Sequence, residues 1–258
     1  MTASHEAIAY LEDVTVDYDG FKALDRLNFF MDRRELRVVI GPNGAGKTTL
    51  LDVISGRVKP AHGRVIFGRN TDLTALSENQ IAALGIGRKF QTPSVFVNLT
   101  VWENVELSLR RPSKGVMATL LGRDRADARE RIAATLATVG LDAKMQAPAG
   151  ALSHGERQWL EIGMVMAQDP ELLLVDEPVA GLTDEETART GELLVDIARD
   201  RSVLVIEHDM EFVRQIARTV TVLHQGTTLC EGPVEKVQSD PRVLEVYIGK
   251  RKDSHAVR

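Results

Sequence analysis

Runs of apolar residues along the chain predict the strands of a buried sheet. Residues 36–40, 172–175 and 203–206 are apolar at nearly every position, as is typical of strands that are covered on both faces of a sheet. Earlier in the chain, residues 8–16 carry apolar side chains at largely even spacing, and residues 27–31 form a second strand-like segment. The pattern predicts an α/β fold with a mixed sheet and an antiparallel β edge.

Between these strands the apolar spacing becomes helical. Residues 47–55 follow the first buried run and end before Gly56, a favourable residue just past a helix end. Residues 123–139 are strongly amphipathic at helical spacing, and the wider region 92–149 shows little strand character. We therefore expect a helical subdomain at residues 92–149, inserted into a sheet domain that is formed by residues 1–91 and 150–258.

The composition narrows the classes of protein to consider. The 258 residues include 32 basic and 37 acidic side chains, and the net charge of −5 argues against a nucleic-acid partner held by phosphate neutralisation. The single cysteine, Cys230, excludes an internal disulfide and suits a reducing cytosol. No apolar run approaches the length of a membrane span, so any membrane-spanning part is expected in other chains.

A glycine-rich stretch joins the buried run at residues 36–40 to the first predicted helix. It fits the phosphate-loop pattern G-x-x-x-x-G-K-[ST] at every required position and is followed by Thr49; its residues are Gly41, Pro42, Asn43, Gly44, Ala45, Gly46, Lys47 and Thr48. The glycines permit a tight turn whose N–H groups point at one anion, and the helix start adds partial positive charge. The stretch predicts a nucleoside triphosphate site, with Lys47 on the β- and γ-phosphates and the Thr48 hydroxyl on Mg²⁺.

Acidic residues follow the buried run at residues 172–175. Asp176 and Glu177 come directly after it, which places both carboxylates at the end of the sheet, although either acid is also a suitable helix cap. His208 follows the run at residues 203–206 in a similar position. Tyr18, on the turn after the first strand, is either a ring that stacks on a nucleotide base or a half-buried aromatic residue at a sheet edge.

These motifs occur together in the order found in the ATP-binding subunits of ATP-binding cassette (ABC) transporters, and the chain resembles that family over essentially its whole length. The order is the phosphate loop, Gln91, residues 152–156, Asp176 with Glu177, and His208. A guanine-reading N-K-x-D motif is absent, which disfavours a GTPase. The resemblance implies a phosphate-loop NTPase fold that binds ATP and Mg²⁺ and couples ATP binding and hydrolysis to solute uptake.

Some segments resemble one branch of the family more than others. Residues 88–91, 152–156 and 207–213 look like the importers of branched-chain amino acids and urea. Residues 88–104, 157–163 and 176–186 are most similar to the ATP-binding subunits of urea importers. The resemblance therefore implies urea as the solute, with a branched-chain amino acid or another small solute as the alternative.

The resemblance also implies roles for residues of the nucleotide site. Asp176 would hold Mg²⁺ through water, together with Thr48 and Gln91, and Glu177 would orient or deprotonate the attacking water. Gln91 would also sense the γ-phosphate. His208 would contact that phosphate, and Tyr18 would stack on the base.

A second set of residues would face a nucleotide held by another subunit. These residues are Ser153, Gly155 and Glu156 of the signature segment and Asp184 of the loop that crosses between subunits. The signature departs from the common L-S-G-G-Q form at His154 and Glu156. Ser153 and the amides of a helix start remain, so we expect anion binding to survive, while Glu156 adds a negative charge near the phosphate site.

The implied partners are a second ABC ATP-binding subunit, membrane-spanning permease subunits and, indirectly, a solute-binding protein. The expected location is peripheral, at the cytoplasmic face of the inner membrane, with apolar Val95 and Phe96 in a loop that docks the permease. A regulatory ATPase of the same fold is a competing hypothesis, but such proteins usually carry two cassettes or a long coiled-coil insertion. A non-hydrolysing scaffold is opposed by the presence of Lys47, Glu177 and His208.

Overall fold

The fold is built from two sheets with helices packed between them and on one side. The computed structural model describes residues 6–89, 95–109 and 123–253. The smaller sheet is antiparallel, with the strand order β2-β1-β4-β5. Its strands are β1 (Ala7–Tyr18), β2 (Phe21–Asp32), β4 (His62–Phe67) and β5 (Thr71–Asp72). This sheet is the antiparallel edge that the even spacing of residues 8–16 predicts.

The larger sheet has six strands in the order β10-β9-β3-β8-β7-β6. All neighbouring pairs are parallel except β9 with β10. The strands are β3 (Leu36–Ile40), β6 (Ile86–Lys89), β7 (Leu172–Asp176), β8 (Ser202–Ile206), β9 (Thr219–His224) and β10 (Thr227–Gly232). Every residue of β3, β7 and β8 is buried, as expected for central strands covered on both faces.

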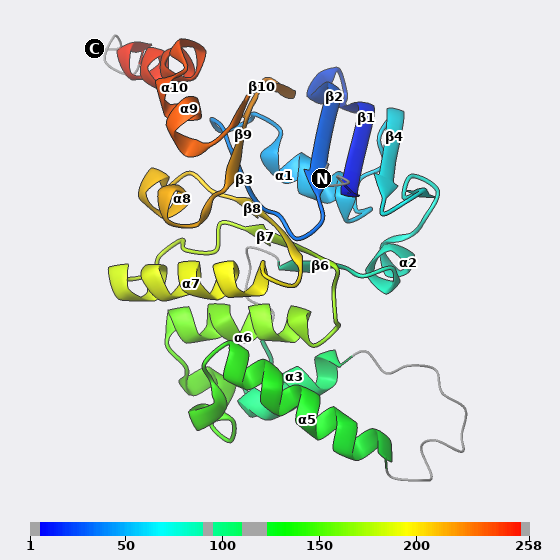
Figure 1. The fold of residues 1–258 in the computed structure, drawn as a ribbon, viewed down its shortest axis with the longest axis vertical. Coiled ribbons are helices and arrows are strands. Elements are labelled where there is room, and N and C mark those ends of the chain that lie inside the picture. The colour runs from blue at the N-terminus through cyan, green and yellow to red at the C-terminus, as the bar shows by residue number, and fades with distance from the viewer. Residues whose placement is uncertain (1–5, 90–94, 110–122, 254–258) are drawn as a thin grey trace, which may run out of the picture.

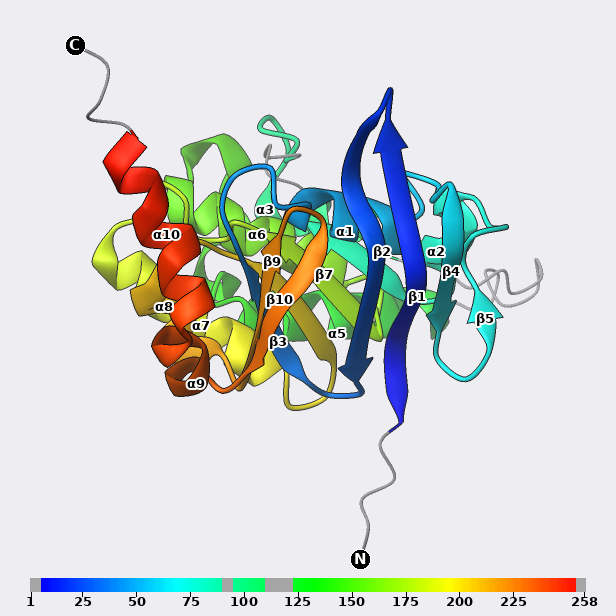
Figure 2. The same ribbon diagram turned by 90° about the horizontal axis from the view of Figure 1, so that it is seen from above.

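Alternate residues of the parallel sheet face two separate cores. Val39, Leu174 and Leu204 pack with the antiparallel sheet and with α1 (Lys47–Ile54). Val175 and Val205 face the opposite way, into the helical side of the molecule. Figure 2 shows the antiparallel sheet standing along one side of the parallel sheet. Helix α1 is thereby fixed between the sheets, with its first turn beside the end of β3.

Helices cover the other face of the parallel sheet. Figure 1 shows α6 and α7 side by side below this sheet, with α3 and α5 farther from it. The Trp159 indole N–H joins α6 to the Thr190 hydroxyl on α7 at 2.9 Å. The helices are α2 (Glu78–Ala83), α3 (Val101–Ser108), α5 (Arg123–Thr138), α6 (His154–Met166), α7 (Asp184–Ile197), α8 (Met210–Ile216), α9 (Val234–Ser239) and α10 (Pro241–Asp253), with short 3-10 turns η1 (Asp142–Lys144) and η2 (Ala149–Ala151).

The described residues between β6 and β7 form helices and turns, without a named strand. Thr100 and Pro148 form an isolated β-bridge that brings the two ends of this segment together. The subdomain boundaries at residues 91/92 and 149/150 stay a prediction. In the described part of the chain, each helix is too short or too polar to cross a lipid bilayer.

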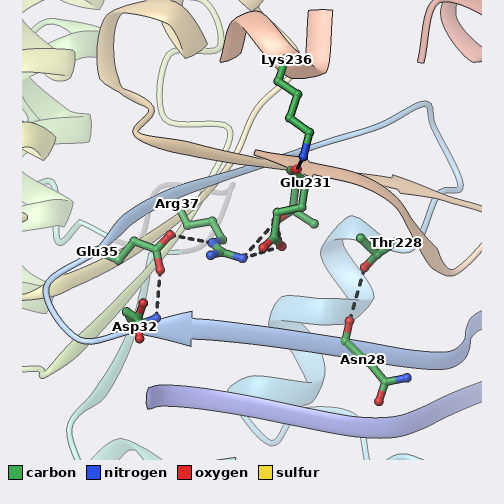
Figure 3. Close-up of polar contacts among 8 residues, drawn as sticks. Asn28, Asp32, Glu35, Arg37, Thr228, Glu231 and Lys236 are labelled. Atoms are coloured by element: carbon green, nitrogen blue, oxygen red, sulfur yellow. Dashed lines mark hydrogen bonds and ion pairs between the residues drawn. The ribbon is translucent and has the colours of Figure 1, made fainter. Parts of the chain in front are cut away.

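The amino end of β3 carries a buried network of charges. Arg37 is 5% exposed, and its guanidinium donates to Glu35 Oε1 at 2.8 Å and to Glu231 Oε2 at 2.6 Å. The other oxygen of Glu35 accepts from the backbone N–H of Asp32 at 2.9 Å. Figure 3 shows these groups meeting between β2, β3 and β10. A buried arginine is therefore tolerated in a central strand because both of its carboxylate partners are in place.

Candidate functional site

The phosphate loop lies at the opposite, carboxyl end of β3 and leads directly into α1. Gly41 and Gly46 have φ values of 152° and 99°, which side chains rarely tolerate. A Cβ at Gly41 would lie 2.2 Å from the Leu223 carbonyl oxygen, and one at Gly46 would lie 2.4 Å from the Ala23 carbonyl oxygen. The loop is therefore held tightly against β9 and β2, and the pattern requires glycine at both positions for geometric reasons.

Lys47, the first residue of α1, is buried and folded back over this loop. Its Nζ donates to the Gly41 carbonyl at 2.8 Å and to the Pro42 carbonyl at 3.2 Å. Thr48 is exposed in the same turn, and Thr49 is half-buried. The N-cap residue is Gly46, and the first turn of α1 carries no acidic side chain. A cation and a helix start thus meet at one point, an arrangement suited to an anion.

Asp176 ends β7 and is 2% exposed. Its Oδ1 is buried without a hydrogen-bond partner in the described residues. Burial raises the pKa of this carboxyl, and the nearby charge of Arg88 acts in the opposite direction. A buried carboxylate oxygen that lacks a partner is costly unless a cation or a bound water satisfies it.

Glu177 follows Asp176 and has a φ of 46°, in the left-handed region. Its backbone N–H donates to the Ile206 carbonyl at the end of β8, at 3.0 Å. Its carboxylate Oε1 lies 3.5 Å from Nδ1 of His208, which follows β8. The unusual backbone conformation and the neighbouring strand end together bring this acid and this imidazole into contact.

Glu207 is a site residue that the sequence motifs do not identify. It is 1% exposed, and its carboxylate accepts from the backbone N–H groups of His208 at 2.8 Å and Asp209 at 3.3 Å. Burial raises its pKa, while these hydrogen bonds act in the opposite direction. Glu207 fixes the turn that carries His208. Its position directly after a buried strand was the available signal.

The signature segment lies at the start of α6. Ser153 is the N-cap, as its position in the sequence predicts, and its Oγ accepts from the backbone N–H of Glu156 at 3.1 Å. Glu156 Oε2 accepts from the Ser153 backbone N–H at 3.0 Å, and Lys144 Nζ lies 2.5 Å from Oε1. Burial acts to raise the pKa of Glu156, but the bonds from Lys144 and Ser153 outweigh it and the pKa is lowered. The extra charge of Glu156 is thus matched by Lys144, which the sequence analysis did not identify.

Two further predicted residues, Tyr18 and Asp184, lie outside this meeting point of strand ends. Tyr18 ends β1, is 46% exposed and faces Phe21 across a tight hairpin. Asp184 is exposed at the start of α7. Gln91 lies outside the described residues. The structure therefore brings the phosphate loop, Asp176, Glu177 and His208 to the carboxyl ends of β3, β7 and β8, and holds the signature on a separate helix.

The predicted docking loop is held in place by hydrogen bonds between its backbone and a buried side chain, Asn104. Asn104 is fully buried; its Oδ1 accepts from the Phe96 N–H at 2.8 Å and its Nδ2 donates to the Phe96 carbonyl at 3.1 Å. The Phe96 ring is 54% exposed, whereas Val95 is half-buried and packs against the core. Asn104 therefore presents the ring of Phe96 at the surface.

Comparisons with known proteins agree with this arrangement. The ABC transporter family matches residues 24–180. The high-affinity branched-chain amino acid transport ATP-binding protein LivG of Escherichia coli K12 is 34% identical over 241 residues, which cover 90% of this chain and 94% of LivG. The crystal structure of an ABC transporter cassette in its ADP conformation has a TM-score of 0.83 at 29% identity and covers 94% of this chain and 99% of that chain. A dimeric cassette bound to ADP and Pi has a TM-score of 0.73 at 25% identity, and the match covers 88% of this chain and 98% of that chain. The likeness confirms the predicted α/β fold with a mixed sheet.

Proposed function

Because the chain belongs to the ABC transporter family, whose cassettes are ATPases that power transport, we propose that it is the ATP-hydrolysing subunit of a solute importer. The observation that carries the proposal is that the phosphate loop and Asp176 with Glu177 lie at the carboxyl ends of β3 and β7, the two strands that flank β8. In this proposal Lys47 leaves the loop carbonyls and binds the β- and γ-phosphates. The backbone N–H groups of the loop and the start of α1 hold the remaining phosphate oxygens.

The residues around the loop fit Mg²⁺ as the metal of the site. Asp176 offers a buried carboxylate oxygen that has no partner in the described residues, and Thr48 offers an exposed hydroxyl in the first turn of α1. Oxygen ligands of this kind are those Mg²⁺ prefers. When bound, Mg²⁺ would neutralise charge on the phosphates. Gln91, which lies outside the described residues, is proposed as a further ligand and as a sensor of the γ-phosphate.

Glu177 and His208 are proposed to act at the γ-phosphate. The separation of 3.5 Å between Glu177 Oε1 and His208 Nδ1 supports this proposal, because both groups could then contact the same water molecule and phosphate. Glu177 would accept a proton from the water or orient it, and His208 would contact the γ-phosphate. Tyr18 is proposed to stack on the base, since its ring is exposed at the end of β1.

The complete site is proposed to need two chains. Ser153, Gly155, Glu156 and Asp184 would contact the nucleotide of a partner subunit, and the dimeric cassette bound to ADP and Pi supports this assembly. The partner is a similar but distinct ATP-binding chain, with the homodimer as the form in isolation. ATP is expected to favour the closed dimer because its γ-phosphate interacts differently with the open and closed states.

Light scattering on the Glu177→Gln variant tests this assembly. The variant should bind ATP without turning it over, so Mg-ATP should raise its mass from that of a monomer to that of a dimer, alone or with the candidate partner. If the Glu177→Gln variant stays monomeric under every condition while the wild-type chain alone hydrolyses ATP at the rate of the assembled transporter, the two-chain site is contradicted.

The solute is proposed to be urea, on the likeness of residues 88–104, 157–163 and 176–186 to urea importers. LivG is named for branched-chain amino acids, so these are the alternative. Uptake of labelled urea and labelled leucine by the assembled transporter with its solute-binding protein separates the two. Uptake of leucine but not of urea would make a branched-chain amino acid the solute, and it would leave the ATPase proposal unchanged.

Phe96 is proposed to dock a membrane-spanning permease, which would place the chain at the cytoplasmic face of the inner membrane. Val95 packs against the core, so Phe96→Asp alone is the sharper test of the loop. The variant should keep its fold and nucleotide affinity but fail to assemble with the permease. Val195→Asp, an exposed apolar position on α7, is the control. Normal assembly and uptake by Phe96→Asp would remove the docking role.

A further inference from the structure

The signature groups proposed to bind a phosphate are occupied by a side chain of the same molecule. The Ser153 hydroxyl donates to Glu186 Oε1 at 3.0 Å. The backbone N–H of Gly155 also donates to the Glu186 carboxylate. These two donors lie in the first turn of α6, where the helix start favours negative charge.

Glu186 reaches α6 from the first turn of α7, where its other oxygen is already engaged. Oε2 accepts from the Thr183 N–H at 3.1 Å and from the Thr183 hydroxyl at 3.2 Å, and Thr183 Oγ1 accepts from the Glu186 N–H at 3.2 Å. This reciprocal pairing is a capping box. One carboxylate therefore caps α7 through Oε2 and crosses to α6 through Oε1.

The absence of a side chain at Gly155 leaves room for the Glu186 carboxylate against the start of α6. A Cβ at position 155 would lie 2.5 Å from both Cδ and Oε1 of Glu186. Any other residue would push the carboxylate away from α6. The glycine of the signature thus admits an anion against the helix start, and in this structure the anion is Glu186.

Glu186 is held in its ionised form. The Thr183 N–H lowers its pKa most, with further lowering from the donors of Ser153 and Gly155, and burial acts in the opposite direction. In the described residues Glu186 has hydrogen bonds but no ion pair, whereas Lys144 pairs with Glu156. A full negative charge therefore stands where the γ-phosphate of a partner's nucleotide is proposed to bind.

We propose that Glu186 is a positioning residue that competes with the γ-phosphate of the partner's nucleotide for Ser153 and Gly155. The inference rests on the proposed two-chain site. The Ser153 hydroxyl has one hydrogen, which it donates either to Glu186 or to a phosphate oxygen. On closure, Oε1 turns away from α6 while Oε2 keeps the cap of α7. After hydrolysis the carboxylate returns to α6 and favours separation of the subunits.

The test compares two variants that each remove one negative charge from the start of α7. Glu186→Gln keeps an acceptor oxygen for the Thr183 N–H and loses the charge that opposes the phosphate. Glu185→Gln is the matched control, since Glu185 is exposed in the same turn. Both are made in the Glu177→Gln background, and the dissociation constant of the Mg-ATP dimer is measured by light scattering at several salt concentrations.

Glu186→Gln should tighten the dimer about tenfold relative to Glu185→Gln, with the difference shrinking as salt rises. A residue that only capped α7 would give no gain, so equal or weaker dimerisation of Glu186→Gln overturns the inference. Glu186→Ala should also tighten the dimer, provided that its melting curve shows a folded chain.

The Ser153→Ala variant distinguishes failure of the two-chain site from failure of the role given to Glu186. If it leaves the dimer unchanged, the two-chain site itself fails; if it weakens the dimer while Glu186→Gln has no effect, only the role of Glu186 fails.

Discussion

The two ends of the parallel sheet differ in whether their buried charged groups have all their hydrogen-bond partners within the described residues. At the amino end of β3, the guanidinium of Arg37 is buried between Glu35 and Glu231 (Figure 3). The Thr221 hydroxyl also donates to Glu231 at 2.9 Å. At the carboxyl ends, Asp176 has a buried oxygen with no partner in the described residues and a raised pKa.

This difference separates residues that support the fold from residues that serve a ligand. A buried charge whose partners lie inside the protein costs stability when it is removed. A buried charge without a partner lowers stability as it stands, and its presence at a strand end is explained by a ligand that completes it. Substitutions at the two ends should therefore have opposite effects on stability and on nucleotide binding.

Among the substitutions that compare the two ends, the largest effect is expected on nucleotide binding, when the cation at the carboxyl end is removed. Lys47→Ala should weaken ATP binding by about a hundredfold or more, since the phosphates lose a buried charged partner. An equilibrium titration with Mg-ATP measures this. Lys236→Ala is the control, because Lys236 donates to the Glu231 carbonyl at the amino end of the sheet. Native affinity in Lys47→Ala would contradict the assignment.

Removing the cation at the amino end should instead destabilise the fold. Arg37→Met leaves Glu35 and Glu231 without their partner, and we expect a loss of about 3 kcal/mol in the free energy of unfolding. Guanidinium chloride unfolding measures it. Nucleotide affinity of the folded fraction should stay unchanged. A variant that lost ATP affinity at native stability would remove the distinction between the two ends.

Asp176→Asn should stabilise the nucleotide-free chain by about 1 kcal/mol at neutral pH, because it removes a buried charge whose Oδ1 has no hydrogen-bond partner in the described residues. Burial raises the pKa of Asp176 in the folded chain above its unfolded value, so the folded state binds more protons and wild-type stability falls as pH rises between those values. The gain should therefore be larger at about pH 8 than at about pH 3, which lies below the unfolded pKa of an aspartate. Unfolding curves at both values test this, and an equal gain or a loss would contradict it. Affinity for Mg-ATP should fall in the same variant.

The smallest expected effect concerns the charge pair of the signature. Lys144→Ala leaves Glu156 unmatched near the phosphate site and should weaken the Mg-ATP dimer about threefold in the Glu177→Gln background. Adding Glu156→Gln should restore the dimer, because the unmatched charge is then gone. If adding Glu156→Gln to Lys144→Ala does not restore the affinity of the Mg-ATP dimer, Lys144 does not act through Glu156.

The parts of the fold that local patterns specify were predictable from the sequence. The buried runs became β3, β7 and β8, and the phosphate loop required its glycines for reasons of backbone geometry. β10 and α9 were missed. β10 has few apolar residues, and α9 is a single short helix after Pro233. β1 extends to Tyr18, beyond the predicted end at residue 16, because Asp17 and Tyr18 still pair with Lys22 and Phe21 of β2.

The candidate site was predictable in its motifs but not in its pairings. Lys144 and Glu156 come from a 3-10 turn and a helix, and Ser153 and Glu186 come from two different helices. No local pattern links such residues, since their contacts depend on how the helices pack. Glu207 had a visible position at the end of a strand, but its role in fixing His208 depends on backbone hydrogen bonds that only the structure displays.

The most direct test of the ATPase site compares binding and turnover in one variant. Glu177→Gln should keep the phosphate loop, Lys47 and Asp176 intact, so ATP affinity should remain close to that of the wild type. Turnover by the transporter assembled with its permease subunits should fall about a thousandfold, because the attacking water loses its base. Hydrolysis by the assembled Glu177→Gln transporter at the wild-type rate would contradict the role given to this carboxylate.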